Sequence, residues 1–389
     1  MSMSRSGFTV EDGIGIQDAV APSYSALRPL NPVEPGIFPV YPDLVDALLK
    51  PSTPFSADIE HPDRTVAHAL ATCSGYAYSD AHTLSTMMAR MGLANNRCRM
   101  IGTYVNAMLI ESTAFVVQSE DGRVVILAYR GTDPSNVINL LTDVDIHPDQ
   151  VAFDIGDGGP YGVHAGFYRN TRATRFKVAE ALLRAKYGHP VTGSGGHPRN
   201  GEPPRNGEVP SPGPLEPMQA LYITGHSLGA AMAAIESIML RTEPNYEWRF
   251  TEELRATYTF AQPLVGSPEL AAACNGDGFL REQVLRFVYQ RDPVPHYPPL
   301  ASGPFRNFGR EFQFSGGGWR ETTTVPAQQS WFLVEQLGGL VAFAARQFPL
   351  LNWIPFPYQI DDHLPQHYIA ALTPPGVRSE FGDYDYTGT

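Results

Sequence analysis

Residues 225–229 read Gly-His-Ser-Leu-Gly and place Ser227 between two glycines, directly after the apolar run 219–224. A serine hydroxyl is nearly inert at neutral pH and becomes a nucleophile when a neighbouring base takes its proton. The spacing suits a sharp turn from a strand into a helix, because glycines let the two elements pass without side-chain clashes. With 36 glycines in 389 residues the pattern also arises by chance, so its meaning depends on the surrounding elements.

A base for this serine must come from a histidine, and three histidines follow Ser227 in the chain, namely His296, His363 and His367. His296 lies in the proline-rich stretch 292–299, too close in sequence to the best acid candidate to meet it across a site. His363 and His367 precede the last helical pattern of the chain. Both remain candidates for the general base.

The acid that orients this histidine is predicted to be Asp292, which directly follows the strand-like run 283–290. The flanking prolines stiffen its loop, which suits a carboxylate that must hold one imidazole tautomer. Asp277 lies in a glycine-rich turn, and Asp361 and Asp362 are too close in sequence to His363 to reach its ring. We therefore expect a Ser, Asp and His site in that chain order.

Charge that develops on the substrate oxygen needs two N–H donors. One is predicted to be the backbone N–H of Leu228, the residue after the nucleophile. The second is expected from the loop after the apolar run 123–130, where Gly131 permits close approach and Thr132 offers an N–H and a hydroxyl.

The elements around these residues alternate between strand and helix patterns. The apolar runs 114–118 and 123–130 flank an Asp-Gly turn signal and predict a hairpin. Further strands are expected at 219–224, 256–263 and 283–290, and helices at 64–79, 81–93, 165–188 and after Ser227. This alternation predicts an α/β fold with a mostly parallel central sheet flanked by helices.

Composition excludes several function classes. The formal net charge of −12 argues against nucleic acid or an anionic membrane held by electrostatics. Three widely spaced cysteines predict buried thiols rather than disulfides or a zinc site, and we expect no metal and no cofactor. No apolar stretch is long enough for a transmembrane helix, and the first twenty residues lack the apolar core of a signal peptide. These features predict a cytoplasmic or non-classically exported protein.

The chain is expected to hold one main domain over residues 66–389, with a proline-rich extension, residues 1–65, packed on it. A proline- and glycine-rich loop, 189–217, is predicted to be exposed. The apolar segment 330–358 has a narrow polar stripe and is predicted to act as a cap over the site or to pack in the core.

Six segments together resemble the fungal-type, class 3 triacylglycerol lipases of the α/β-hydrolase superfamily. In chain order they read AYRGTDP, VHAGFYRN, GHSLGAAMA, TFAQPLVGS, RFVYQRDPVPHYPP and DHLPQHYIAAL. The resemblance implies a triad of Ser227, Asp292 and His363, and an oxyanion hole of Thr132 and Leu228. It selects His363 over His367, because His363 aligns with the histidine that precedes a tyrosine in the family. The typical glycine and arginine of FGxPRVG are Ala261 and Leu264 here.

The resemblance also implies a lipid or ester substrate, a lid, and transient contact with a lipid interface through apolar segments. Residues 134–150 occupy the usual place of the lid, and 330–358 is the second candidate. Triacylglycerol lipase activity is the leading interpretation. The alternatives are a phospholipase A1 or a short-chain carboxylesterase with the same triad and, more remotely, a non-catalytic lipid-binding protein.

Overall fold

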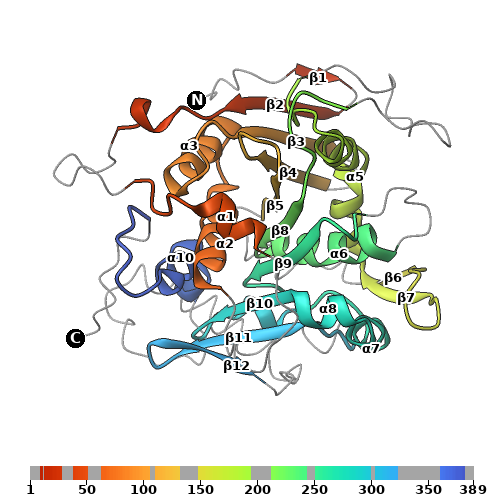
Figure 1. The fold of residues 1–389 in the computed structure, drawn as a ribbon. Coiled ribbons are helices and arrows are strands. Elements are labelled where there is room, and N and C mark those ends of the chain that lie inside the picture. Colours follow the sequence, from red (N-terminus) through yellow and green to blue (C-terminus); the bar gives the residue numbers. More distant parts are fainter. Residues whose placement is uncertain are drawn as a thin grey trace, which may run out of the picture.

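One ten-stranded sheet forms the centre of the computed structural model (Figure 1). The structure describes residues 9–11, 13–28, 38–50, 63–105, 110–131, 148–193, 212–242, 250–298, 303–322 and 360–381. In spatial order the strands are β1 (Thr9–Glu11), β2 (Ile14–Val20), β3 (Arg97–Val105), β4 (Ile110–Gln118), β5 (Val124–Tyr129), β8 (Ala220–His226), β9 (Leu254–Phe260), β10 (Val284–Tyr289), β11 (Arg310–Ser315) and β12 (Gly318–Thr322).

The middle of the sheet is parallel and its two ends are antiparallel. Strands β5, β8, β9, β10 and β11 run in one direction. Strands β1 to β5 alternate in direction, and β12 folds back on β11. The predicted α/β fold with a mostly parallel central sheet is confirmed. The Asp121-Gly122 turn joins β4 to β5, and Gly122 has a φ of 95° that favours glycine.

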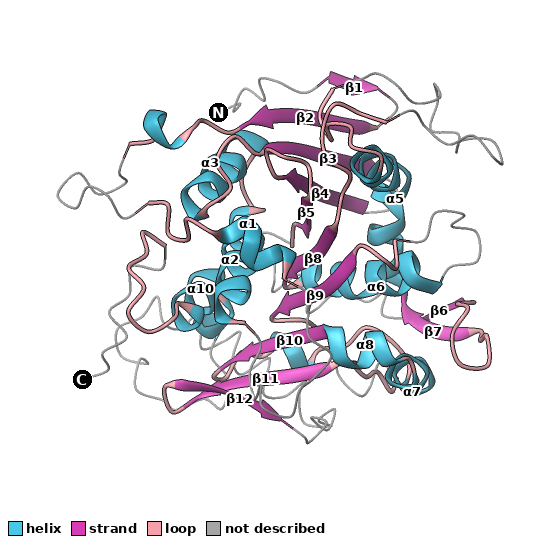
Figure 2. Ribbon diagram, in the orientation of Figure 1, coloured by secondary structure: helices cyan, strands magenta, loops and turns pink. Residues whose placement is uncertain are grey.

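Helices cover both faces of this sheet, as Figure 2 shows. One face packs against α5 (Ala165–Lys186), α6 (Leu228–Thr242), α7 (Pro268–Gly276) and α8 (Gly278–Gln283). The other packs against α1 (Leu44–Leu49), α2 (Arg64–Tyr76), α3 (Ala81–Met91) and α10 (Pro365–Leu372).

The central strand β5 shows why its sequence is almost continuously apolar. Successive side chains of a strand point to opposite faces, and both faces of this strand are covered. Three side chains join the core with α5 and α6, and the three between them join the core with α1 to α3. The first set is Val125, Leu127 and Tyr129, and the second is Val124, Ile126 and Ala128.

Short elements complete the described part of the fold. A separate two-stranded sheet pairs β6 (Pro148–Val151) with β7 (Tyr161–His164). Three 3₁₀ helices span Tyr24–Ala26, Val294–His296 and Ile360–His363. The last of these carries the predicted catalytic histidine.

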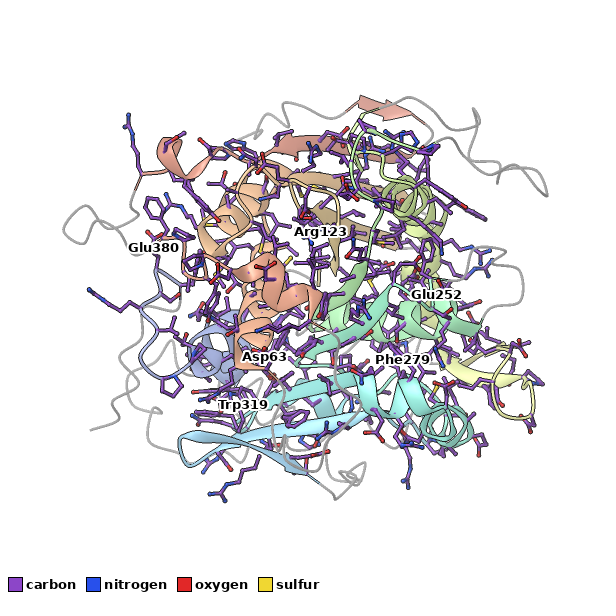
Figure 3. The ribbon with its side chains drawn as sticks, in the orientation of Figure 1. Asp63, Arg123, Glu252, Phe279, Trp319 and Glu380 are labelled. Carbon is purple, nitrogen blue, oxygen red and sulfur yellow. The ribbon has the colours of Figure 1, made fainter. Side chains whose placement is uncertain are left out.

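The N-terminal extension is partly built into the main sheet. Strand β2 pairs along its whole length with β3, from Ile14 opposite Thr103 to Val20 opposite Arg97. Glu380, labelled in Figure 3, lies in the C-terminal segment. Its buried carboxylate pairs with Arg90 of α3 at 2.8 Å and holds this segment on the α2 and α3 side. Both ends of the described chain therefore pack on the same domain.

Several predictions lie outside the described residues, including Thr132, most of the lid candidate 134–150, the middle of the loop 189–217, and all of 330–358. Within the described part, the cysteines Cys73, Cys98 and Cys274 are free and buried, as predicted. No helix in that part is long and apolar enough to cross a membrane.

Candidate active site

Ser227 occupies a strained turn between the end of β8 and the start of α6. Its φ is 59°, a left-handed conformation that is uncommon for a residue other than glycine. The Ser227 N–H donates to the Phe260 carbonyl at 2.9 Å, which ties the turn to the neighbouring strand β9. Such strain persists where the surrounding structure holds it, and it raises the serine above the carboxyl edge of the sheet.

The two flanking glycines are required by close backbone approach. A Cβ at position 225 would lie 2.2 Å from the Gly229 carbonyl oxygen, and one at position 229 would lie 2.2 Å from the Tyr129 carbonyl oxygen. Both distances are far inside van der Waals contact with rigid backbone. The motif Gly-His-Ser-Leu-Gly is therefore explained position by position by the turn that presents Ser227.

The structure brings Ser227, His363 and Asp292 into one hydrogen-bonded line. The Ser227 Oγ lies 2.9 Å from His363 Nε2. On the other side of the ring, His363 Nδ1 lies 3.1 Å and 3.0 Å from the two Asp292 carboxylate oxygens. All three residues are at least 98% buried. This is the geometry in which a serine, a base and an orienting acid act as one unit.

Asp292 is held as a carboxylate by the groups around it. Burial alone would raise its pKa, but the charge and hydrogen bond of His363, the Tyr368 hydroxyl and the Val294 N–H outweigh burial and lower the pKa. The Tyr368 hydroxyl donates to Asp292 Oδ2 at 2.6 Å, and the Val294 N–H donates to Oδ1 at 2.9 Å. An ionised Asp292 accepts the Nδ1–H of His363 and leaves Nε2 free to face the serine.

The His363 backbone is held by His226, the residue before the nucleophile. The His226 Nε2 lies 2.7 Å from the His363 carbonyl oxygen. A carbonyl only accepts, so His226 Nε2 carries the proton, and its Nδ1 accepts from the Tyr78 hydroxyl at 2.9 Å. Burial, and then the charge of His363, lower the pKa of His226 to about 3, so its ring stays neutral.

The remaining candidates from the sequence lie elsewhere. The His367 ring stacks on Tyr289 with centroids 5.5 Å apart, whereas His363 contacts both the serine and the acid. Asp277 caps α8 and pairs with Arg241 at 2.9 Å. His296 is largely buried, and burial lowers its pKa.

One predicted oxyanion donor can be placed. Leu228 is the first residue of α6, where backbone N–H groups have no partner within the helix. Gly131, at the end of the loop after β5, lies against this turn, since a Cβ there would meet the Tyr78 hydroxyl at 2.3 Å and the His226 carbonyl at 2.5 Å. Thr132 follows directly but lies outside the described residues, so its role stays a prediction.

Sequence reasoning did not predict the groups that hold the triad, namely Tyr368, Tyr78 and His226. Tyr368 had a signal in the spacing of histidine and tyrosine at the end of the chain, and His226 stands inside the nucleophile motif. Tyr78 is 148 residues from its partner His226, and only the fold brings them together. No three His, Cys, Asp or Glu side chains gather as possible metal ligands in the described ranges.

Comparison with known proteins shows which family this chain resembles. The profile of the family described as "Lipase (class 3)" matches residues 214–302, which carry Ser227, Leu228 and Asp292. This part of the chain is similar to the class 3 lipases. Its curated relatives include a lipase of Rhizopus niveus, 26% identical over 208 residues, 52% of this chain and 41% of the relative. Secreted mono- and diacylglycerol lipase 1 of Fusarium solani is 25% identical over 215 residues, 54% of this chain and 50% of the relative.

This class 3 lipase relative thus matches half or less of the length of those curated proteins. Among solved structures, the lipase of Rhizopus microsporus var. chinensis is similar with a TM-score of 0.50 and 20% identity, over 81% of this chain and 92% of that chain. That similarity supports the α/β-hydrolase fold.

Proposed function

We propose that this class 3 lipase relative hydrolyses carboxylic esters, with triacylglycerols as the leading substrate class, through an acyl-enzyme on Ser227. The observation that carries the proposal is the buried line from Ser227 Oγ through the His363 ring to Asp292, with bonds of 2.9 to 3.1 Å. A serine in this setting loses its proton to the histidine as it attacks an ester carbonyl.

In the proposed acylation step, Ser227 Oγ attacks the ester carbonyl and His363 Nε2 takes its proton. Asp292 accepts the Nδ1–H, which keeps the ring oriented and stabilises the imidazolium. The tetrahedral oxyanion accepts from the N–H of Leu228 and from Thr132. The imidazolium then protonates the leaving alcohol, and the acyl group stays on Ser227.

Deacylation repeats these roles with water as the nucleophile. His363 takes a proton from water, the hydroxide attacks the acyl carbon, and the proton returns to Ser227 Oγ as the fatty acid leaves. The position of the His363 ring suits both steps, because Nε2 faces Ser227 Oγ, where both the serine and the water react.

The nucleophile is tested by Ser227→Ala, for which we expect a loss in kcat on the order of 10⁵–10⁶ with a p-nitrophenyl ester. Asp292→Asn should cost on the order of 10³–10⁴, because the wrong tautomer is then favoured. Ser237→Ala, the same change further along α6, is the matched control and should keep full activity, since its hydroxyl bonds the Ala234 carbonyl. Retained turnover in Ser227→Ala, or no labelling of Ser227 by a fluorophosphonate, would refute the proposal.

Substrate class is tested with tributyrin, a long-chain triacylglycerol and phosphatidylcholine. Faster turnover of the long-chain triacylglycerol supports triacylglycerol lipase activity. Preference for phosphatidylcholine would indicate a phospholipase A1, and preference for dissolved short esters a carboxylesterase. Contact with a lipid interface through 134–150 or 330–358 is part of the same proposal, and predicts a jump in rate when the substrate passes its solubility limit.

A further inference from the structure

Asp362, directly before His363, is a carboxylate of the site that the triad does not use. Only 8% of the residue is exposed, whereas its neighbour Asp361 on the same 3₁₀ helix is exposed. Asp362 Oδ2 accepts a hydrogen bond from the backbone N–H of Arg291 at 3.1 Å. Arg291 directly precedes Asp292, so this bond joins the residue before the acid to the residue before the base.

The bond closes a small ring of contacts around the catalytic pair. Two chain segments run side by side there, 291–292 and 362–363. The side chain of Asp362 holds the backbone of the first segment, and the side chain of Asp292 holds the ring carried by the second at 3.0 Å. A shift of one segment along the other therefore breaks both contacts together.

Keeping a carboxylate in this place is unfavourable in itself. Burial raises the pKa of Asp362 to about 6, the Arg291 N–H opposes that rise, the negative charges of Asp292 and Asp361 add to it, and the charge of Arg291 lowers it. His363 and Tyr368 are the other titratable groups of the immediate surroundings. A folded pKa above the unfolded value means that this group favours folding at low pH and opposes it as pH rises through about 6.

We propose that Asp362 is a positioning residue for catalysis, whose carboxylate holds the Asp292 loop in register with the His363 segment by accepting the Arg291 N–H. This inference rests on the proposed function. It gives Asp362 a part in the reaction without contact to substrate, since it acts through the relative placement of Asp292 and His363. Displacements of about 1 Å at a catalytic group can cost on the order of a hundredfold in rate.

The test compares three variants in the full-length protein, with kcat and KM measured on p-nitrophenyl butyrate at pH 8. Asp362→Leu keeps a similar shape and removes the acceptor, so kcat should fall about tenfold or more with KM little changed. Asp362→Asn keeps an oxygen that accepts the Arg291 N–H, and should stay within about threefold of the wild type. Asp361→Leu is the matched control, which removes an exposed carboxylate one residue away, and should stay close to the wild type.

Unfolding temperature separates positioning from a general loss of stability. Removing the buried carboxylate at pH 8 offsets the loss of the Arg291 N–H bond, so Asp362→Leu should unfold close to the temperature of the wild type while its kcat falls. The inference would be overturned by an unchanged kcat in Asp362→Leu, or by an equal loss of kcat in Asp362→Asn or Asp361→Leu. A kcat that falls only in step with the unfolding temperature would overturn it as well. Failure of the proposed function looks different, since ester turnover would then survive Ser227→Ala.

Discussion

The variant Tyr368→Phe removes one hydroxyl and should show how much the hydrogen bond to the catalytic acid contributes, apart from the contribution of the acid itself. In the structure this hydroxyl donates to Asp292 Oδ2 at 2.6 Å and accepts the N–H of Tyr289 at 3.0 Å. Tyr368 is 1% exposed, and burial together with the charge of Asp292 raises its pKa well above the usual value. The phenol therefore stays protonated and acts as a donor throughout the working pH range.

The size of the effect follows from these two contacts. Hydrogen bonds to a charged group contribute about 1.5–3 kcal/mol, and a buried N–H left without a partner costs about 1–3 kcal/mol. Phenylalanine loses the first bond and leaves the Tyr289 N–H unsatisfied, so we expect about 3–5 kcal/mol less stability. The carboxylate and its bonds to His363 remain, so kcat should fall by only about tenfold, or about 1.4 kcal/mol in transition-state energy, well short of the loss in Asp292→Asn.

Urea unfolding and the pH profile of kcat/KM on p-nitrophenyl butyrate measure both effects. Without the Tyr368 donor the pKa of Asp292 should rise, so activity should begin to fall at a higher pH on the acid side. Tyr289→Phe is the matched control, because its hydroxyl accepts a hydrogen bond from the Gln290 side-chain amide at 2.8 Å. Wild-type stability and rate in Tyr368→Phe would refute the reasoning, and so would a loss as large as that in Asp292→Asn.

Two further predictions test the turn around Ser227 and the buried histidine His68. Gly229→Ala places a methyl group 2.2 Å from the Tyr129 carbonyl oxygen, so it should cost at least about 3 kcal/mol and most of the activity, whereas Gly276→Ala, where nothing lies within 4 Å, should be tolerated. Thermal unfolding and kcat of the two variants check this contrast. Burial lowers the pKa of His68 to about 4, below the unfolded value of 6.5, so its share of stability is lost as pH falls through this range. By pH 5 the loss amounts to about 2 kcal/mol of unfolding free energy. His68→Gln should therefore reduce the fall in unfolding free energy between pH 7 and pH 5 by about this amount. An unchanged fall would contradict the prediction.

The fold was predictable where local pattern and tertiary environment agree. Residues 124–129 are all apolar, which predicts a strand covered on both faces, and β5 is buried on both faces. The helix expected at 165–188 is α5, Ala165–Lys186, which ends two residues before Gly188 with its φ of 74°. In each case the sequence carries a periodicity and a stop signal that need no distant partner.

Other strands could not be found in this way. Strand β2 reads Ile-Gly-Ile-Gln-Asp-Ala-Val and carries a charged residue and an exposed Val20. Its place in the sheet comes from pairing with β3, more than seventy residues later. The same holds for β11 and β12, which are joined by the glycine-rich turn around Gly316. Trp319 of β12 donates a hydrogen bond to the Ala371 carbonyl of α10, which holds that helix against the two strands. Pairing between distant segments leaves little trace in local composition.

The triad was predictable because chain order and stiff loops limited the choices, but its support was not. Asp362 was considered only as an orienting acid, and its nearness in sequence to His363 correctly excluded that role. Its position next to His363 gives Asp362 a different role, because its side chain accepts the backbone N–H of Arg291, the residue before Asp292, at 3.1 Å. Such a contact depends on how two loops approach, which no spacing along one chain segment reveals.

The catalytic histidine lies on a short element, and contacts from other elements therefore have to fix its position. His363 ends a 3₁₀ helix of four residues, too short to fix a side chain by its own hydrogen bonds. Its position is instead set from three sides, by Asp292 on the ring, by His226 on the carbonyl oxygen, and by the bond between Asp362 and Arg291. The nucleophile, in contrast, stands between a strand and a fifteen-residue helix. Substitutions in the His363 segment itself, such as Asp362→Leu, should therefore affect rate more than stability, and those at the Ser227 turn, such as Gly229→Ala, should affect both.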